Sequence, residues 1–594
     1  MALSALAAFG ALATAVAPAA PGFDDWSEAF AADWVRLSAE QATRAQYFSG
    51  DEQAALERQL TPLTPERRQR QRALAGAGLA QLGRYDSAAL TPTQRTSATL
   101  LRWSLQRTLG ETSYADHNFV FNQLGGPHVR LVSFLTETHP LRHAADVDAY
   151  LARLAQVDLR LDEGLVRARR ASARGLLPPR FIVERAQAQV AAFLAAPPAQ
   201  NDFVTALARR SERMAGLAPE ARQQALATAE ATVATRVLPA YRRVAAYLDE
   251  LLPRTGSDAG LWRLPDGAAA YTQALATHTT TTLDAEAIHV LGLREVARIE
   301  AEMDRVLKGL GRSEGTVRER TLALRREVMP PAEPDPRPAL LARYAAAVQD
   351  AERRAQPYFK LQPRALVEVR RVPALTERTS SAYYTTPAPD GSQPGVFWVP
   401  LPGPAFNVLG LRSLAVHEAV PGHHFQLALQ QEAGSLPRWR QRRIFGGGSA
   451  HSEGWALYAE RLAIDEGWYD GDPHSLLGAL DSQLFRARRL VVDTGLHAKR
   501  WTREQAIAYG IGAQEVERYV ANPGQACAYM VGMLRLLALR DEARAALGGR
   551  FELKAFHDVV LQTGSVPLDV LSEVLRAWVQ AQLAGAGAPT AAAR

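Results

Sequence analysis

The sequence predicts a mainly α-helical protein with a small β-sheet. Across 23–326, apolar residues recur at intervals of three and four, which is the period of amphipathic helices. Two short runs, 365–373 and 395–402, are rich in β-branched and aromatic residues and are typical of strands. Across 411–582 the helical period returns. A chain of 594 residues with 47% hydrophobic side chains can bury a large core, so we expect one large, two-lobed helical body around the sheet.

The clearest helical pattern in the first half lies in 146–165. Its apolar residues form one stripe and predict a core-facing surface: Val147, Tyr150, Leu151, Leu154, Val157, Leu161 and Leu165. Pro178 and Pro179 end this helical region, and 217–252 has the pattern of a further long helix. Asp284 is a suitable N-cap for a helix over 285–292.

The chain divides into three predicted parts. Residues 1–20 predict a signal peptide, because Ala2 to Val16 is apolar and 17–19 has the small-x-small form of a cleavage site, although no Lys or Arg precedes it. We therefore expect a periplasmic or secreted protein. The Pro-rich segment 327–341 predicts a boundary between an N-terminal helical lobe, 21–330, and a catalytic lobe, 331–594, which holds the sheet and further helices.

Composition excludes several classes of protein. The 68 basic and 62 acidic side chains give a thinly spread charge of +6 without a basic run, so nucleic-acid binding is not favoured. No later apolar run reaches the roughly 20 residues that a membrane-spanning helix needs. Cys527 is the only cysteine, so an internal disulfide and cysteine-rich metal sites are excluded, and any metal must be bound by His and carboxylates.

The segment VHEAVPGHHFQ, 416–426, has the residue types of a metal-binding helix, with an interruption. Two His four residues apart share one helical face, but His417 is followed by His423 and His424 instead. In a regular helix His423 would point roughly 240° away, and His424 would lie roughly 10 Å along the axis. Pro421 disrupts a helix and Gly422 tolerates unusual dihedrals, so we expect a bulge of two residues that brings His423 beside His417.

This reasoning prefers His423 as the second ligand and leaves His424 as the alternative, in the second shell or facing substrate. Glu418 directly follows the first ligand, where a carboxylate can act as the catalytic base. A catalytic zinc needs a third protein ligand, and we assign Glu453 in the helical segment AHSEGWALYAERLAIDEGW. Glu460, seven residues later on the same face, is then a candidate acceptor that orients a ligand His.

Two consecutive tyrosines precede this metal-binding segment. Tyr383 and Tyr384 point to opposite faces if the chain is extended, so one of them is a candidate for contact with substrate, and simple packing within the sheet is the alternative.

Five segments together resemble the bacterial family known as domain of unknown function 885. They are VHEAVPGHHFQ, SEGWALYAE, RLVVDTGLHAKRWTREQAIAY, NPGQACAYMVG and FHDVVLQTGSVPLDVL, and the resemblance extends over about 23–582. That family is similar to gluzincin-type zinc metallopeptidases, which implies a mainly α, two-lobed body with a deep channel and a small sheet beside the metal helix. Carried over, the resemblance makes His417, His423 and Glu453 ligands of one zinc ion, with Glu418 as the base.

The resemblance also implies roles for later residues. Related peptidases place a Tyr or His opposite the metal, which makes Tyr529 and His557 candidate catalytic donors to an oxyanion. Gln525 is a further candidate at the site. Arg489 or Arg535 is a candidate for binding a substrate carboxylate, which would favour carboxypeptidase or dipeptidyl-carboxypeptidase action.

These observations lead to one hypothesis and two alternatives. The hypothesis is a zinc metallopeptidase that hydrolyses short peptides. The first alternative keeps the metal but acts on non-peptide amides or esters. The second is a non-catalytic helical binding protein in which the motif is structural, and substitution of Glu418 would then have no effect.

Overall fold

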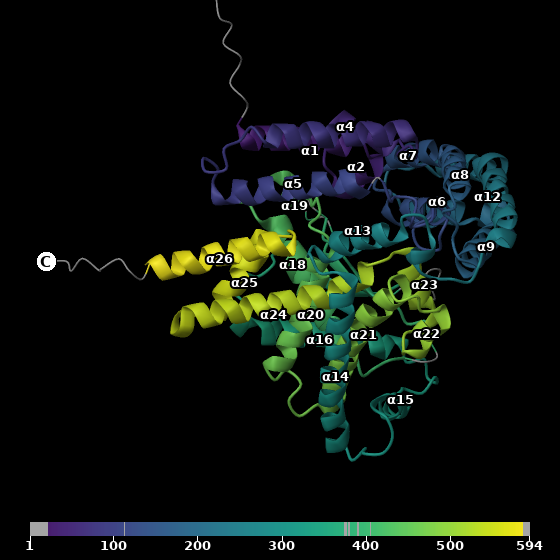
Figure 1. Ribbon diagram of the computed structural model, residues 1–594. Helices are drawn as coiled ribbons and strands as arrows, with labels where there is room; N and C mark the ends of the chain where they lie inside the picture. Colours follow the sequence, from purple (N-terminus) through teal and green to yellow (C-terminus); the bar gives the residue numbers. More distant parts are fainter. Residues whose placement is uncertain are drawn as a thin grey trace, which may run out of the picture.

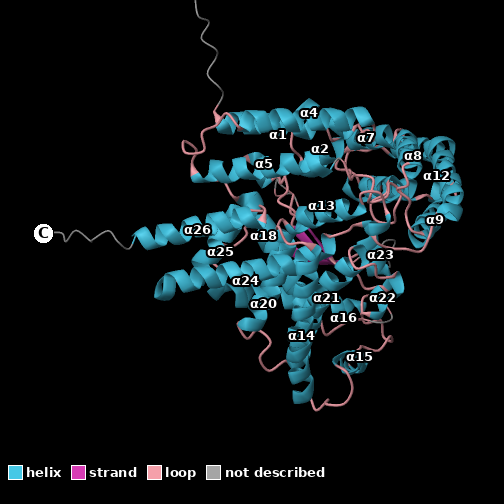
Figure 2. Ribbon diagram, viewed as in Figure 1, coloured by secondary structure: helices cyan, strands magenta, loops and turns pink. Residues whose placement is uncertain are grey.

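The structure is a computed structural model that describes residues 22–111, 113–372, 377, 381–388, 391, 393–403 and 406–585. It is mainly α-helical with one small sheet, which confirms the predicted fold class (Figure 2). The predicted signal peptide lies outside the described residues. Within them, every helix is too short or too polar to cross a membrane.

The N-terminal helices form an upper layer of α1, α4 and α5 and a cluster around α7, α8, α9 and α12 at one end of it (Figure 1). Their bounds are α1 Phe23–Arg36, α2 Ala39–Ala45, α3 Gly50–Glu57, α4 Pro65–Leu82, α5 Pro92–Glu111, α6 Pro127–Ser133, α7 Ala144–Leu154, α8 Val157–Ala173, α9 Arg180–Ala195, α10 Asp202–Ser211, α11 Pro219–Thr232, α12 Leu238–Leu251 and α13 Gly267–Thr279. Short π-helical turns continue α6 over Phe134–Thr138 and join α11 to α12 over Val233–Val237.

The predicted stripe in 146–165 belongs to the core of this cluster. Six of its seven apolar side chains are buried, and Leu151 packs against the same core half-buried. The predicted N-cap is also confirmed, because the Asp284 side chain accepts a hydrogen bond from the backbone N–H of Ala287 at 2.8 Å. The helix that it caps extends to Gly309, well beyond the predicted end at residue 292.

The sheet precedes the helix at Leu411, as predicted. Strand β3 (Gly395–Val399) lies in the middle, with β1 (Val367–Arg371) parallel to it and β2 (Tyr383–Thr385) antiparallel to it. β3 is almost entirely buried. The sheet therefore packs inside the helical body, with β2 at one edge.

The remaining helices build the lower part of the molecule in Figure 1. Their bounds are α14 Ala285–Gly309, α15 Val317–Glu327, α16 Arg337–Ala355, α17 Leu411–Glu418, α18 His423–Glu432, α19 Arg438–Gln441, α20 Ser449–Asp465, α21 Pro473–His497, α22 Arg503–Ala508, α23 Ala513–Ala521, α24 Ala528–Leu547, α25 Leu553–Thr563 and α26 Leu568–Gly585.

The main hydrophobic core crosses the predicted boundary at residue 330. The ring of Phe30 in α1 stacks on Phe445 with centroids 5.9 Å apart, and Trp439 of α19 donates a hydrogen bond to Ser27. The first helix thus packs directly against the helices that follow the sheet.

Close packing of two helices positions α20. Gly454 of α20 and Gly532 of α24 face each other, and a Cβ on Gly454 would come within 2.5 Å of the Gly532 backbone. The lack of side chains lets the two helix backbones approach closely. This contact fixes the height of Glu453, the neighbour of Gly454, relative to the rest of the core.

Candidate metal centre

The interrupted helix is in fact two helices. α17 ends at Glu418 and α18 begins at His423, so residues 419–422 form a sharp turn, whereas the sequence predicts a bulge within one helix. A Cβ on Gly422 would lie 1.9 Å from the carbonyl oxygen of His417. Only glycine fits this turn, which reverses the chain tightly enough to return His423 to the end of α17.

Three predicted ligands lie together. The Nε2 atom of His417 is 3.7 Å from Oε2 of Glu453, and the Nε2 atom of His423 is 3.5 Å from the same oxygen. The two imidazole rings are nearly perpendicular, with centroids 4.9 Å apart. One ligand atom from each residue lies within 4.8 Å of the others. The turn and the α20–α24 contact together create this cluster.

The spacing of these atoms fits a shared cation. Separations of 3.5 and 3.7 Å are too long for N–H···O hydrogen bonds. Donors about 2.0–2.2 Å from a tetrahedral zinc ion lie roughly 3.3–3.6 Å from one another. Two imidazole nitrogens and one carboxylate oxygen are also a common ligand set for zinc. The residues present therefore fit this metal.

The cluster is accessible from one side. The His417 side chain is only 4% exposed, whereas those of His423 and Glu453 are 13% and 20% exposed. Three protein ligands at a partly exposed position leave a fourth coordination position for water or substrate. This arrangement is typical of catalytic zinc sites, since structural sites are closed by four protein ligands.

Glu460 holds His417 in place from the buried side. The His417 Nδ1 atom donates a hydrogen bond of 2.7 Å to Oε1 of Glu460. The hydroxyls of Ser413 and Ser482 both donate to the other oxygen of Glu460. A carboxylate bonded in this way fixes the tautomer of the imidazole, so that Nε2 faces the cluster as an acceptor.

The electrostatics of the cluster favour positive charge. Burial alone would lower the pKa of His417, but the carboxylates of Glu453 and Glu460 raise it to about 9. Burial would likewise raise the pKa of Glu460, but Arg486 and the hydrogen bond from His417 hold it below its usual range. Both carboxylates are therefore ionised, which is what a cation site needs.

Substitution of Glu460 tests its positioning role. We expect Glu460→Gln to weaken zinc binding about 10- to 100-fold, because an amide lacks the charge that orients His417 and makes it more basic. Competition with a chromophoric chelator measures the change, and the exposed Glu504→Gln is the matched control. Unchanged zinc affinity in folded Glu460→Gln would contradict this role.

Glu418, the predicted base, occupies the last turn of α17. Its side chain is 6% exposed, and within the described part of the chain its carboxylate has no hydrogen bond or ion pair. A mostly buried carboxylate without a partner next to metal ligands is free to accept a proton.

His424 points away from the cluster. Its Nδ1 atom is 2.9 Å from the hydroxyl of Tyr384, and burial lowers the pKa of His424 to about 4. The neutral ring accepts the hydroxyl hydrogen. The structure thus brings His423 to Glu453, and it places His424 and Tyr384 together beside the sheet. Tyr383 is 38% exposed and stacks on Trp398.

Arg489 and Tyr529 contact each other. The Arg489 guanidinium lies 4.4 Å from the centroid of the Tyr529 ring and 3.2 Å from Glu515. Its Nε and Nη1 atoms have no hydrogen-bond partner among the described residues. Gln525 is bound by Arg518. No contact joins these residues to the three clustered ligands.

Two predicted candidates are occupied by internal contacts. His557 is fully buried, with one ring nitrogen 2.8 Å from the Tyr458 hydroxyl and the other 2.8 Å from the carbonyl of Tyr358. Neither nitrogen is left for an oxyanion, so we do not retain His557 as a catalytic donor. Arg535 is bound by Ser572 and is 3.4 Å from Glu542.

Sequence reasoning missed the residues that support the cluster. Ser413, Ser482 and Arg486 surround Glu460, and the Trp455 indole N–H donates to the carbonyl of Pro421 at 2.8 Å, which fixes the turn. The spacing of Ser413, four residues before His417, is the one signal that places it on the same face of α17.

Comparison with family models identifies the chain. Residues 40–575 match the family described as "Bacterial protein of unknown function (DUF885)". The chain belongs to this family. Comparison with curated proteins finds no match.

Two solved structures are similar to this DUF885 chain. One is titled "The crystal structure of the putative lipoprotein from Colwellia psychrerythraea"; it is 31% identical, has a TM-score of 0.86, and the match covers 93% of this chain and 99% of that one. The other, "a putative lipoprotein of unknown function from Shewanella oneidensis", is 20% identical with a TM-score of 0.69, and the match covers 94% and 100%. At this lower identity the second structure shows the shared fold alone.

Proposed function

We propose that this DUF885 protein is a zinc-dependent hydrolase that cleaves peptide bonds in short peptides. The observation that carries the proposal is the cluster of His417, His423 and Glu453, whose three ligand atoms lie within 4.8 Å of one another and are partly exposed. The unpartnered carboxylate of Glu418 beside this cluster supports a catalytic role over a structural one. The similarity to gluzincin-type peptidases is the reason for choosing peptides as substrates.

Each residue has a defined task in this mechanism. When bound, zinc supplies Lewis acidity that polarises a scissile carbonyl and activates water. Glu418 accepts the proton of the attacking water and passes it to the leaving amine. Glu460 keeps the His417 ring oriented throughout. Arg489, with two free guanidinium nitrogens, is the candidate for a substrate carboxylate, and Tyr529 beside it is the candidate oxyanion donor.

We infer that the protein acts outside the cytoplasm, in the periplasm or after secretion. The apolar segment at 2–16 and the titles of the two similar structures support this location. A lipid anchor is not part of the proposal, because Cys527, the only cysteine, is completely buried.

The test is a hydrolysis assay across substrate classes. We expect zinc-loaded protein to cleave peptides in a defined mixture, followed by mass spectrometry, and metal-depleted protein to be inactive. Stepwise shortening from the carboxyl end would assign carboxypeptidase or dipeptidyl-carboxypeptidase action. Cleavage of esters or non-peptide amides alone would replace the peptidase proposal with the first alternative, and inactivity on every class would favour a binding protein.

A further inference from the structure

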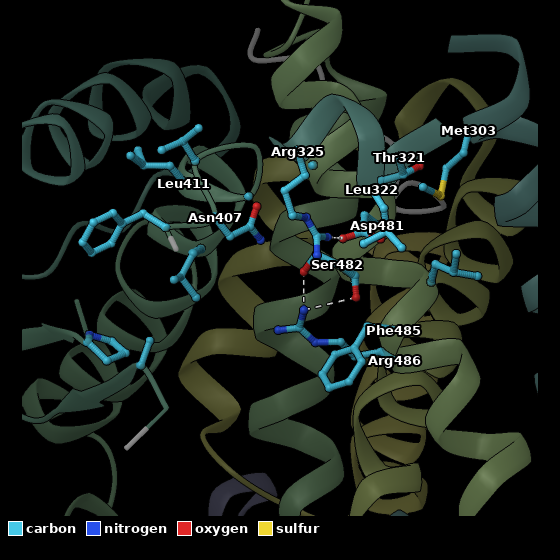
Figure 3. Close-up of a pocket in the computed structure, with 18 of the residues that line it drawn as sticks. Met303, Thr321, Leu322, Arg325, Asn407, Leu411, Asp481, Ser482, Phe485 and Arg486 are labelled. Carbon is cyan, nitrogen blue, oxygen red and sulfur yellow. Dashed lines mark hydrogen bonds and ion pairs between the residues drawn. The ribbon is translucent and has the colours of Figure 1, made fainter. Parts of the chain in front are cut away.

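A second cavity lies beside the metal centre and is separate from it. It has a volume of about 560 Å³, which is within the range of small-molecule sites, and it is enclosed by α14, α15, α17, α21 and the chain that follows β3 (Figure 3). Ser482 and Arg486 line it. The four residues of the proposed active site, His417, Glu418, His423 and Glu453, do not.

Basic side chains dominate the charge of this cavity. Arg318, Arg325, Arg486 and Arg488 line it, with Asp481 as the one acidic lining residue. Asp481 pairs with Arg325, and Arg488 pairs at 2.8 Å with Glu300, which is not part of the wall.

Two of these arginines keep unneutralised charge. Arg486 approaches Glu460 only to 3.7 Å, which is too long for a hydrogen bond. Arg318 has no ion pair within the described part of the chain. The cavity therefore carries excess positive charge, and an anionic group would compensate it.

Two guanidinium groups meet at one point of the wall. Arg325 contacts Asp481 and Arg486 contacts Ser482, which are consecutive residues of α21. Figure 3 shows the two arginine side chains approaching this point from opposite directions. Arginine N–H groups recognise carboxylates through paired hydrogen bonds, so this point suits the head group of a carboxylate.

The rest of the wall is largely apolar. The side chains that cover it include Leu322, Leu340, Leu401, Leu411, Leu414 and Phe485. Burial of apolar ligand surface against such side chains is favourable. A small, fully polar anion would leave this surface unused.

We propose that this cavity binds a small amphiphilic carboxylate, with its head group at Arg325 and Arg486 and its apolar body against the leucines and Phe485. Binding does not rest on the proposed function. It would be sensed at the metal centre, however, because Ser482 donates a hydrogen bond to Glu460, which in turn holds His417. If the protein is a peptidase, a peptide fragment with a free carboxyl end would be one source of such a ligand, and a fatty acid another.

Calorimetric titration of the full chain tests the proposal with two carboxylate probes, decanoate and N-acetyl-leucyl-leucine. Their neutral counterparts are decanol and N-acetyl-leucyl-leucinamide. We expect at least one carboxylate to bind about tenfold or more tightly than its neutral counterpart, since hydrogen bonds to a charged group are lost in the latter. The tighter carboxylate identifies the source of the ligand.

Two variants locate the site. Arg486→Gln removes the unneutralised charge, and Leu322→Trp fills the mouth of the cavity without touching Glu460; Leu322 is 37% exposed, so we expect this variant to fold. Each should weaken carboxylate binding about tenfold. Arg353→Gln, an exposed arginine of α16 outside the cavity, is the matched control and should bind as the wild type does.

The proposal is overturned by any of three results. Neither carboxylate binds at concentrations up to about 1 mM; the neutral counterparts bind as tightly as the carboxylates; or folded Leu322→Trp binds as the wild type does. Titrations with and without added zinc keep this test separate from the proposed function, since a protein that fails to bind zinc would still bind the carboxylate.

Discussion

Glu418→Gln should lower peptide hydrolysis about 100- to 10,000-fold while leaving the zinc content unchanged. The side chain keeps its shape but loses its ability to accept a proton. Glu418 is not one of the three clustered ligands, and its carboxylate has no partner in the described part of the chain, so little else depends on its charge. Steady-state rates and metal analysis on the same preparation measure both quantities.

The control for this prediction is Glu230→Gln, which makes the same chemical change on the exposed face of α11 and should be fully active. A Glu418→Gln protein that binds zinc and keeps more than about one-tenth of the wild-type rate would exclude Glu418 as the base.

Gly422→Ala should disable the metal centre through the backbone. The new methyl group would lie 1.9 Å from the His417 carbonyl oxygen and 2.3 Å from that of Val416, so the turn must open and carry His423 away. We expect a loss of about 1–3 kcal/mol in the free energy of unfolding. We also expect zinc affinity to fall at least as far as on loss of an outer carboxylate, about 10- to 100-fold.

Gly434→Ala is the matched control, because a Cβ there meets no atom within 4 Å. Denaturant unfolding and zinc titration compare the two variants. If Gly422→Ala binds zinc like Gly434→Ala, the turn does not determine the position of His423.

The sequence was sufficient to predict the helical fold and the sheet before Leu411. Both rest on local periodicity, which the chain displays directly. The turn at 419–422 was anticipated as an interruption, because Pro421 and Gly422 are strong local signals. Its form, two helices in place of one bulged helix, depends on Trp455, which lies 34 residues from Pro421 in the chain.

Burial was the main quantity that the sequence did not reveal. His557 has the residue type of a catalytic donor, but its environment of Tyr458 and Tyr358 is formed by segments 99 and 199 residues away. The same reason hid Ser482 and Arg486, since nothing local indicates that α21 passes beside Glu460. Long-range packing decided these roles.

The most direct test of the account is the zinc content of purified protein after exposure to zinc and removal of excess metal. We predict about one zinc ion per chain for the wild type and for His424→Ala, and loss of zinc from His417→Ala, His423→Ala and Glu453→Ala, each with a wild-type circular dichroism spectrum. A folded wild-type protein that retains no zinc, or a His423→Ala variant that retains a full equivalent, would contradict the account.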